Sequence, residues 1–175
     1  MNLYGDSYTF MPKKSYTDDK GRKRWLRNDE VASIIKSLGE YLIIGGYPED
    51  HAKRYAQIAH TISRWPDSID KLDDQNKLDS LPGVGGIITG YLEEIVTTGT
   101  TVKFDDDQYG PPPPRTVLEL TTIDRLGAKT ARMLYKDFGI DSLAALCNAL
   151  SDGQLDGVKG FGPKMKETIS KVCSS

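Results

Sequence analysis

The chain has 175 residues, of which 38% are hydrophobic and 27% charged, and it contains no apolar run long enough to span a membrane. This composition excludes a disordered or membrane-spanning chain and is typical of one or two small soluble domains. Residues 1–6 lack the basic and then apolar pattern of a secretory signal, so we expect a cytoplasmic, nucleoid or nuclear protein that is not secreted.

The charge is distributed unevenly, although the net charge is only −2. Residues 1–28 hold seven Lys and Arg against three Asp, residues 29–114 hold seven against fifteen acidic residues, and residues 115–175 hold nine against seven. Affinity for nucleic acid comes largely from neutralised phosphates. The acidic middle segment is therefore an unfavourable DNA surface, whereas the two basic ends are better candidates.

Residues 1–27 predict a basic, flexible tail that contains aromatic residues. The basic residues are Lys13, Lys14, Lys20, Arg22, Lys23, Arg24 and Arg27, and the aromatic residues are Tyr4, Tyr8, Phe10, Tyr16 and Trp25. Such a tail can contact a nucleic-acid backbone and stack on bases. The alternatives are a solvated arm without a partner and an arm that packs on a partner protein.

Residues 28–99 predict a domain of four to five helices. An apolar stripe at helical spacing runs from Val31 to Leu42, and a second helix over 48–64 ends before Pro66. Short helices over 68–72 and 76–81 precede a glycine-rich turn, and a further helix ends near Gly99. No segment shows the alternation of a strand, so the predicted fold class is all-α with two small helical lobes.

Residues 100–114 predict a linker, because residues 105–107 are all Asp and residues 111–114 are all Pro. Three adjacent Asp residues do not converge on one ion, so we interpret them as solvated.

Residues 115–175 predict a second helical domain. Cys147 and Cys173 have neither metal-ligand spacing nor the pattern of a disulfide framework, so we expect two unpaired cysteines in a reducing compartment.

Three short sequence motifs share one pattern and give the strongest indication of function. They are Leu81-Pro82-Gly83-Val84-Gly85, Ile123-Asp124-Arg125-Leu126-Gly127 and Val158-Lys159-Gly160-Phe161-Gly162, and a helical pattern follows each. This is the layout of a helix-hairpin-helix, in which a tight turn needs a residue that tolerates a positive φ. The first N–H groups of the following helix have no internal partner and attract anions.

The hairpins predict binding to DNA phosphates. The candidate phosphate-binding residues are Gly83, Gly85, Gly86, Arg125, Gly127, Lys129, Lys159, Gly160, Gly162, Lys164 and Lys166. The second and third motifs are the stronger candidates, because Lys residues lie near the starts of the helices that follow them. Arg125 stands where Gly is preferred, so either that turn differs locally or its side chain projects toward a phosphate.

Residues 28–173 resemble the N-terminal module of the family X DNA polymerases, the polymerase beta-like group. The resemblance is carried by residues 51–62, 81–86, 93–99, 120–127, 138–146 and 160–164. It implies a lyase-like domain with the first helix-hairpin-helix, a second domain with two more, and a role in DNA repair or replication on double-stranded or gapped DNA. It also implies a K or Na ion, held by the backbone of Leu81, Val84, Thr121, Ile123 and Leu126, and no other cofactor.

Two departures from the family argue against catalysis. The chain does not include the palm domain that carries nucleotidyl transfer, so we expect it not to polymerise. The family's lyase Lys aligns with Tyr91 and a neighbouring basic position with Ile87, and Tyr cannot form an imine with an abasic sugar. A substitute nucleophile such as Lys53 is the remaining route to lyase activity.

We therefore predict a non-catalytic DNA-binding protein without sequence preference and without catalytic residues. One alternative is a structural or protein-interaction subunit, with a protein partner bound through the acidic residues 29–114 or through the basic tail. A second alternative is the N-terminal fragment of a longer DNA repair polymerase.

Overall fold

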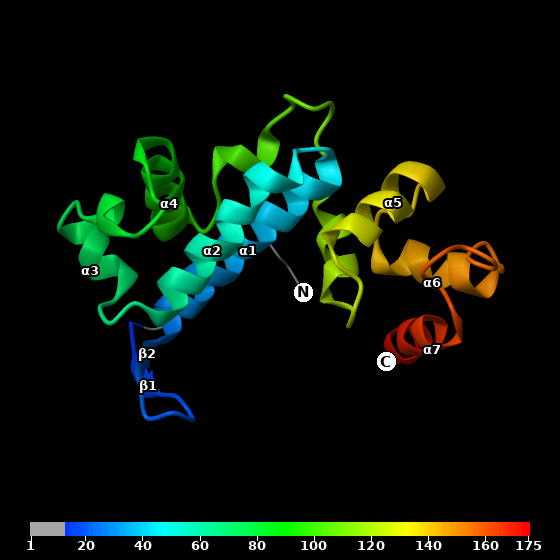
Figure 1. Cartoon of the computed structure of the whole chain (residues 1–175), viewed down its shortest axis with the longest axis horizontal. Coiled ribbons are helices and arrows are strands. Elements are labelled where there is room, and N and C mark those ends of the chain that lie inside the picture. The colour runs from blue at the N-terminus through cyan, green and yellow to red at the C-terminus, as the bar shows by residue number, and fades with distance from the viewer. Residues whose placement is uncertain (1–12) are drawn as a thin grey trace. The chain divides into compact units, whose positions relative to one another are not determined.

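The computed structural model describes residues 13–175, which form an all-α fold apart from one two-stranded sheet (Figure 1). The strands are β1 (Ser15–Thr17) and β2 (Lys23–Trp25). The α-helices are α1 (Leu26–Gly45), α2 (Glu49–Arg64), α3 (Ile69–Asp74), α4 (Gly86–Thr98), α5 (Ala128–Phe138), α6 (Leu143–Ser151) and α7 (Pro163–Cys173). Short 3₁₀ helices are η1 (Leu78–Ser80), η2 (Val102–Asp105) and η3 (Arg115–Thr122).

Two compact units make up the described chain. The N-terminal unit comprises the described residues up to Gly39 together with Pro48–Asp106, and the C-terminal unit comprises Glu40–Tyr47 together with Asp107–Ser175. Helix α1 contributes residues to both units. One boundary therefore falls inside a helix, which the apolar periodicity of the sequence does not indicate.

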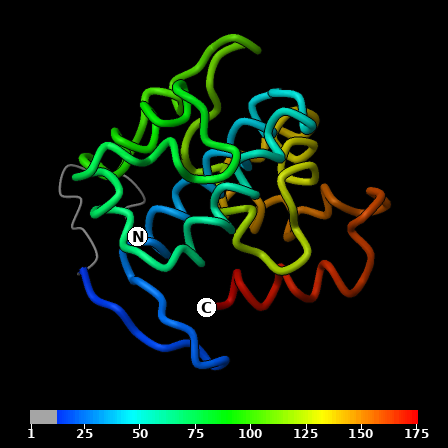
Figure 2. The backbone as a smooth tube through the Cα atoms, turned by 60° about the vertical axis from the view of Figure 1, so that its left-hand side comes forward, coloured from blue at the N-terminus to red at the C-terminus, as the bar shows by residue number. Residues whose placement is uncertain are grey.

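The described part of the predicted flexible tail is folded, which corrects that prediction for residues 13–27. Strands β1 and β2 pair antiparallel, with Ser15 opposite Trp25, and Figure 2 shows them side by side in blue. The Trp25 indole N–H donates to the carbonyl of Pro66 at 2.9 Å and so ties the sheet to the N-terminal unit. The strands are short and their support is tertiary, so no alternating pattern marks them. Tyr4, Tyr8 and Phe10 lie outside the described residues.

The turn between the strands is organised by Asp18. Its carboxylate accepts the backbone N–H groups of Lys20 and Arg22, each at 2.9 Å, and pairs with the guanidinium of Arg24 at 3.0 Å. The hydrogen bond from the Arg22 N–H, together with these other donors, holds the pKa of Asp18 well below its ordinary value. Arg22 and Arg24, which the sequence predicts to belong to a flexible tail, thus stabilise the turn between β1 and β2.

Arg27, predicted as part of the tail, instead lies in the core of the N-terminal unit, where its side chain is 3% exposed. Its Nε is 3.3 Å from a carboxylate oxygen of Asp70, and its other nitrogens pair with Glu30 and donate to the Val96 carbonyl. Burial alone would lower the pKa of Arg27, but hydrogen bonds and charge from Glu30 and Asp70 raise it above its ordinary value. The residue therefore joins three segments.

The segment 100–114 does not run as a solvated spacer. In the N-terminal unit Phe104 is fully buried and Lys103 forms an ion pair with Asp106. In the C-terminal unit the Tyr41 hydroxyl donates to the carbonyl of the buried Pro113. The acidic and proline-rich composition predicts a linker, but Phe104 is buried in the N-terminal unit and Pro113 is buried in the C-terminal unit.

In the C-terminal unit, η3 and α6 are the elements on which the other helices pack. Helix η3 packs against α5 and α6, and α6 packs against α7. The Glu119 carboxylate accepts the Leu143 N–H at 2.9 Å, which joins η3 to the start of α6. Helix α5 ends at Gly139, which has the left-handed φ of 67° that is typical of a glycine after a helix. This packing positions the second and third hairpins.

Candidate nucleic-acid interface

The three predicted hairpins form the same backbone turn, and we call them hairpin 1 (residues 81–85), hairpin 2 (residues 123–127) and hairpin 3 (residues 158–162). The fourth residue donates its N–H to the carbonyl of the first at 3.0 Å in each: Val84 to Leu81, Leu126 to Ile123 and Phe161 to Val158. The third residue has a positive φ: 82° at Gly83, 65° at Arg125 and 93° at Gly160. The repeat in the sequence is therefore a repeat in structure.

The backbone of hairpin 2 at Arg125 matches that of the other two hairpins. Its φ of 65° lies in the left-handed region that glycine occupies in the other two hairpins, so the turn is not altered. An L-residue pays roughly 1–2 kcal/mol for this conformation. The Arg125 side chain is 76% exposed and lies 3.6 Å from the equally exposed Asp124, so that ion pair holds it only weakly.

The fourth residue of each hairpin points inward. Val84 is 8% exposed, and Leu126 and Phe161 are each 2% exposed. Burial of one apolar side chain fixes each turn on its own unit, so the backbone on the opposite side of the turn is held toward solvent. Hairpin 1 belongs to the N-terminal unit, and hairpins 2 and 3 belong to the C-terminal unit.

The last residue of each hairpin is a glycine that the fold itself does not require. Gly85, Gly127 and Gly162 are the N-caps of α4, α5 and α7, with φ of −101°, −82° and −70°. Any residue adopts these angles, and a Cβ atom added at any of the three would meet nothing within 4 Å. The space beside these helix starts is therefore open to a group from outside the chain.

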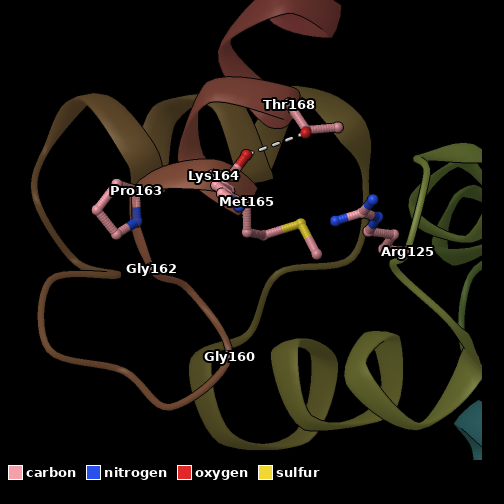
Figure 3. A pocket seen from close by; sticks show the side chains of 7 residues that line it. All are labelled: Arg125, Gly160, Gly162, Pro163, Lys164, Met165 and Thr168. Atoms are coloured by element: carbon pink, nitrogen blue, oxygen red, sulfur yellow. Dashed lines mark hydrogen bonds between the residues drawn. The ribbon is translucent and has the colours of Figure 1, made fainter.

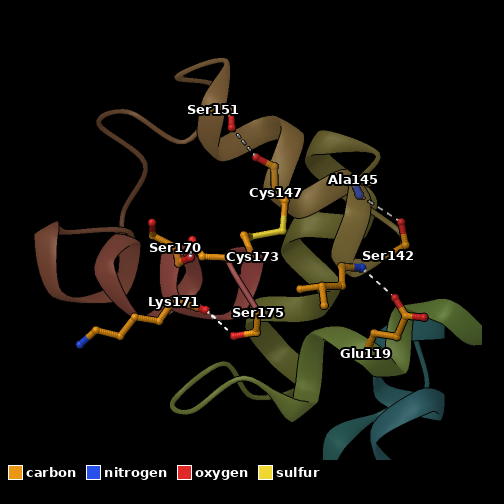
Figure 4. Close-up of a disulfide and its surroundings, with 11 residues drawn as sticks. Glu119, Ser142, Ala145, Cys147, Ser151, Ser170, Lys171, Cys173 and Ser175 are labelled. Carbon is orange, nitrogen blue, oxygen red and sulfur yellow. Dashed lines mark hydrogen bonds between the residues drawn. A yellow bond between two sulfur atoms is a disulfide. The ribbon is translucent and has the colours of Figure 1, made fainter. Parts of the chain in front are cut away.

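The amides at these helix starts also lack a side-chain cap. No N-cap side chain bonds to the first turn of α4, α5 or α7. Helix α6, which follows no hairpin, is capped by Ser142, whose hydroxyl accepts the Ala145 N–H at 3.2 Å (Figure 4), although α2 and α3 have no such cap either. No N-cap side chain therefore occupies the first-turn N–H groups of the hairpin helices.

Hairpin 3 differs from the others in a way that the sequence analysis missed. Helix α7 begins with Pro163, which has no N–H, whereas Gly86 and Ala128 supply one at the same position in α4 and α5. The sequence could have indicated this difference, because a proline at the first position of a predicted helix means that this position has no N–H donor. Hairpin 3 therefore offers one backbone donor fewer.

The candidate cations surround hairpins 2 and 3 but not hairpin 1. Lys129, Lys159 and Lys164 are exposed, whereas Lys166 forms an ion pair with Asp156 and is half-buried. Around hairpin 1, helix α4 contains no Lys or Arg, and Ile87 in its first turn is 75% exposed. The two kinds of hairpin therefore share a backbone but differ in the charge around it.

Four of the candidate residues line one cavity in the C-terminal unit. Arg125 of hairpin 2 and Gly160, Gly162 and Lys164 at hairpin 3 surround a space of about 540 Å³ (Figure 3). Lys129, Lys159 and Lys166 are not among its lining residues, and Gly83, Gly85 and Gly86 belong to the N-terminal unit. The structure thus places hairpins 2 and 3 on either side of one cavity.

The predicted cation ligands retain free acceptor capacity at hairpin 2. The Ile123 carbonyl accepts one N–H, from Leu126, and each carbonyl has two lone pairs. Thr121, Ile123 and Leu126 also line a surface hollow of about 470 Å³. At hairpin 1 the Leu81 carbonyl accepts the Val84 N–H in the same way. Backbone oxygens of this kind fit a hard monovalent cation.

The two cysteines form a disulfide, which corrects the prediction that they are unpaired. Cys147 of α6 and Cys173 of α7 have Cα atoms 5.8 Å apart and a sequence separation of 26 (Figure 4). Their spacing has no motif, but the packing of α6 on α7 places them together. The closed loop contains the whole of hairpin 3.

Comparisons with known proteins agree with this arrangement. The family of SAM-like helix-hairpin-helix tandems matches residues 117–171, which contain hairpins 2 and 3. The chain is also 22% identical over 144 residues to a protein of Bacillus subtilis (strain 168), the DNA polymerase/3'-5' exonuclease PolX. The match covers 82% of this chain and 24% of the relative, so the chain spans about a quarter of the length of that protein. The comparisons therefore support a helix-hairpin-helix tandem in residues 117–171 and a distant similarity of the chain to that protein.

Within residues 13–175, no helix is both long enough and apolar enough to cross a membrane.

Proposed function

We propose that this chain is a non-catalytic protein that binds the phosphate backbone of double-stranded or gapped DNA without sequence preference, and that it corresponds to the N-terminal module of a family X polymerase. The observation that carries the proposal is the repeated hairpin, whose N-cap glycine leaves helix amides uncapped and unobstructed. Hairpins 2 and 3 bind the backbone, because exposed Lys residues surround them. The PolX relative is a DNA polymerase and exonuclease by name, which is consistent with DNA as the ligand.

Fluorescence anisotropy with a labelled duplex over a salt series tests this proposal. We expect binding at low salt, with log K falling by about 0.9 per neutralised phosphate for each unit of log salt. Lys159→Ala and Lys164→Ala should each weaken binding several-fold and reduce the magnitude of the slope by about one. Lys77→Ala in the acidic N-terminal unit is the matched control and should change neither. Absent binding at low salt, or affinity that salt does not alter, contradicts the proposal.

The proposed absence of lyase activity rests on helix α4 and on Lys53. Helix α4 has Tyr91 at the aligned position and no Lys or Arg. Lys53 pairs with Asp50 at 2.9 Å, and the hydrogen bond and charge of Asp50 raise the pKa of Lys53, whereas an amine nucleophile needs a lowered one.

Borohydride trapping on abasic DNA measures lyase chemistry directly. We expect no covalent adduct for two reasons. Helix α4 has no Lys whose amine could attack the sugar, and the raised pKa of Lys53 keeps its amine in the protonated form, which is not a nucleophile. A known abasic-site lyase is the positive control. An adduct that Lys53→Ala abolishes would assign the activity to Lys53 and reject the non-catalytic proposal.

A protein-interaction subunit is the second candidate function. The acidic residues 29–114 and the exposed Ile87 beside the uncharged hairpin 1 favour it. A stoichiometric protein partner that persists after nuclease treatment, combined with no DNA affinity, would replace the first proposal. If the open reading frame continues into a palm domain, the chain is instead the front part of a repair polymerase.

If a monovalent cation is bound, the carbonyls of Thr121, Ile123 and Leu126 at hairpin 2 would hold it, and those of Leu81 and Val84 at hairpin 1. Its charge would add to the attraction of hairpin 2 for a phosphate.

A further inference from the structure

We propose that the cavity between hairpins 2 and 3 binds a single unpaired nucleotide of a DNA strand. This inference rests on the proposed DNA binding and adds a ligand class to it. The cavity measures about 540 Å³ and lies within the C-terminal unit. Pockets of 300–1,000 Å³ hold small organic ligands. Contact with a phosphate backbone needs only surface amides, so the cavity is larger than that contact requires.

The lining of the cavity is complementary to a nucleotide. Arg125 and Lys164 contribute two cationic side chains, and none of the described lining residues is acidic. Met165 and Pro163 contribute apolar surface, whereas Gly160 and Gly162 leave space because they have no side chain. A ligand that matches both features carries negative charge and a flat apolar body, as a nucleoside phosphate does.

Arg125 provides the surface on which a base would stack. Figure 3 shows its guanidinium directed across the cavity toward the thioether of Met165. A guanidinium plane stacks on aromatic rings, and a thioether is polarizable and adapts to them. A base between these two groups would contact both. The chain keeps Arg at a position of positive φ, where Gly would be less strained, which is consistent with a role for the side chain.

The position of the cavity favours a nucleotide without a pairing partner. The start of α7 borders the cavity and Arg125 reaches it from hairpin 2, so phosphates bound by the two hairpins would flank the cavity. A paired base would first have to leave the duplex, at a cost of a few kcal/mol, whereas a base opposite a gap is already free. We therefore expect gapped DNA to bind more tightly than intact duplex.

Anisotropy and 2-aminopurine fluorescence on the full chain test this inference. The two DNAs are an intact duplex and the same duplex with a one-nucleotide gap opposite 2-aminopurine. We expect about ten-fold tighter binding to the gapped DNA, in the range that one base–side chain stack provides. The 2-aminopurine fluorescence should change on binding to gapped DNA only. Equal affinities and unchanged fluorescence would overturn the inference but leave the proposed function intact, and no binding to either DNA would overturn both.

Two variants and two controls locate the effect. Arg125→Gly keeps the turn, because glycine accepts the positive φ, and Met165→Ala removes the opposing thioether; each should abolish the preference and the fluorescence change. Lys159→Ala should weaken binding to both DNAs equally, and Met133→Ala on α5, which is half-buried and outside the lining, should have no effect. Retention of the preference in both Arg125→Gly and Met165→Ala would overturn the assignment to this cavity.

Free deoxyadenosine monophosphate distinguishes a strand-borne nucleotide from a free one. We expect millimolar concentrations to leave the 2-aminopurine signal unchanged, because the strand-borne base is also held through its flanking phosphates. Displacement of the signal by micromolar nucleotide, without release of the DNA, would overturn the inference in favour of a free-nucleotide site.

Discussion

Replacement of both Cys147 and Cys173 by Ser is expected to lower the unfolding free energy of the C-terminal unit by about 3–4 kcal/mol. The disulfide closes a loop with a sequence separation of 26 and thereby restricts the unfolded chain, and a loop of this length corresponds to a stabilisation of that order. The loop includes hairpin 3 and α7, so the effect falls on the unit that carries the tandem.

Urea unfolding with and without dithiothreitol measures this effect. Cys173 is exposed and Cys147 is half-buried, so a reducing agent reaches the bond. The untreated protein should lose stability on reduction, whereas the double Ser variant should be equally stable in both conditions. The same midpoint for the oxidised and reduced protein would show that the disulfide contributes nothing to stability.

Replacement of Arg27 by Ala is expected to destabilise the N-terminal unit by about 3–5 kcal/mol. The substitution leaves the carboxylates of Glu30 and Asp70, which are 11% and 10% exposed, without their buried cation. It also removes the donor to the Val96 carbonyl. An uncompensated buried charge costs much more than a lost surface pair.

Arg22→Ala is the matched control for this experiment. Arg22 also pairs with a carboxylate, that of Asp18, but its side chain is 48% exposed, and such a pair contributes at most about 1 kcal/mol. Thermal and urea unfolding of the two variants should differ clearly. If Arg27→Ala lost no more stability than Arg22→Ala, the buried cluster would have no special role.

The hairpins and most helices could be predicted from the sequence because their determinants are local. Val84, Leu126 and Phe161 each follow the turn at a fixed spacing, and their inward position is a consequence of that turn. The end of α5 at Gly139 likewise follows from one residue type. The backbone at Arg125 could not be decided in this way, since its side chain gives no local signal of a positive φ.

The features that the sequence did not reveal depend on contacts between distant residues. Arg27 meets Asp70 and Val96, which are 43 and 69 positions away, so in the sequence it is indistinguishable from the basic residues that precede it. The cysteines come together only because α6 packs on α7. The sheet of β1 and β2 depends on Asp18 and on the tie from Trp25 to Pro66. Charge and spacing alone carry none of this information.

The uncapped starts of α4, α5 and α7 have a thermodynamic consequence. A glycine N-cap is less stabilising than Ser, Asp or Asn by a few tenths of a kcal/mol, so the three helices together forgo up to about 1 kcal/mol. Selection for stability alone would favour residues such as Ser142, which caps α6. The three glycines therefore leave the folded state less stable than better N-caps would make it, and they do so at the helix starts that we propose contact phosphates.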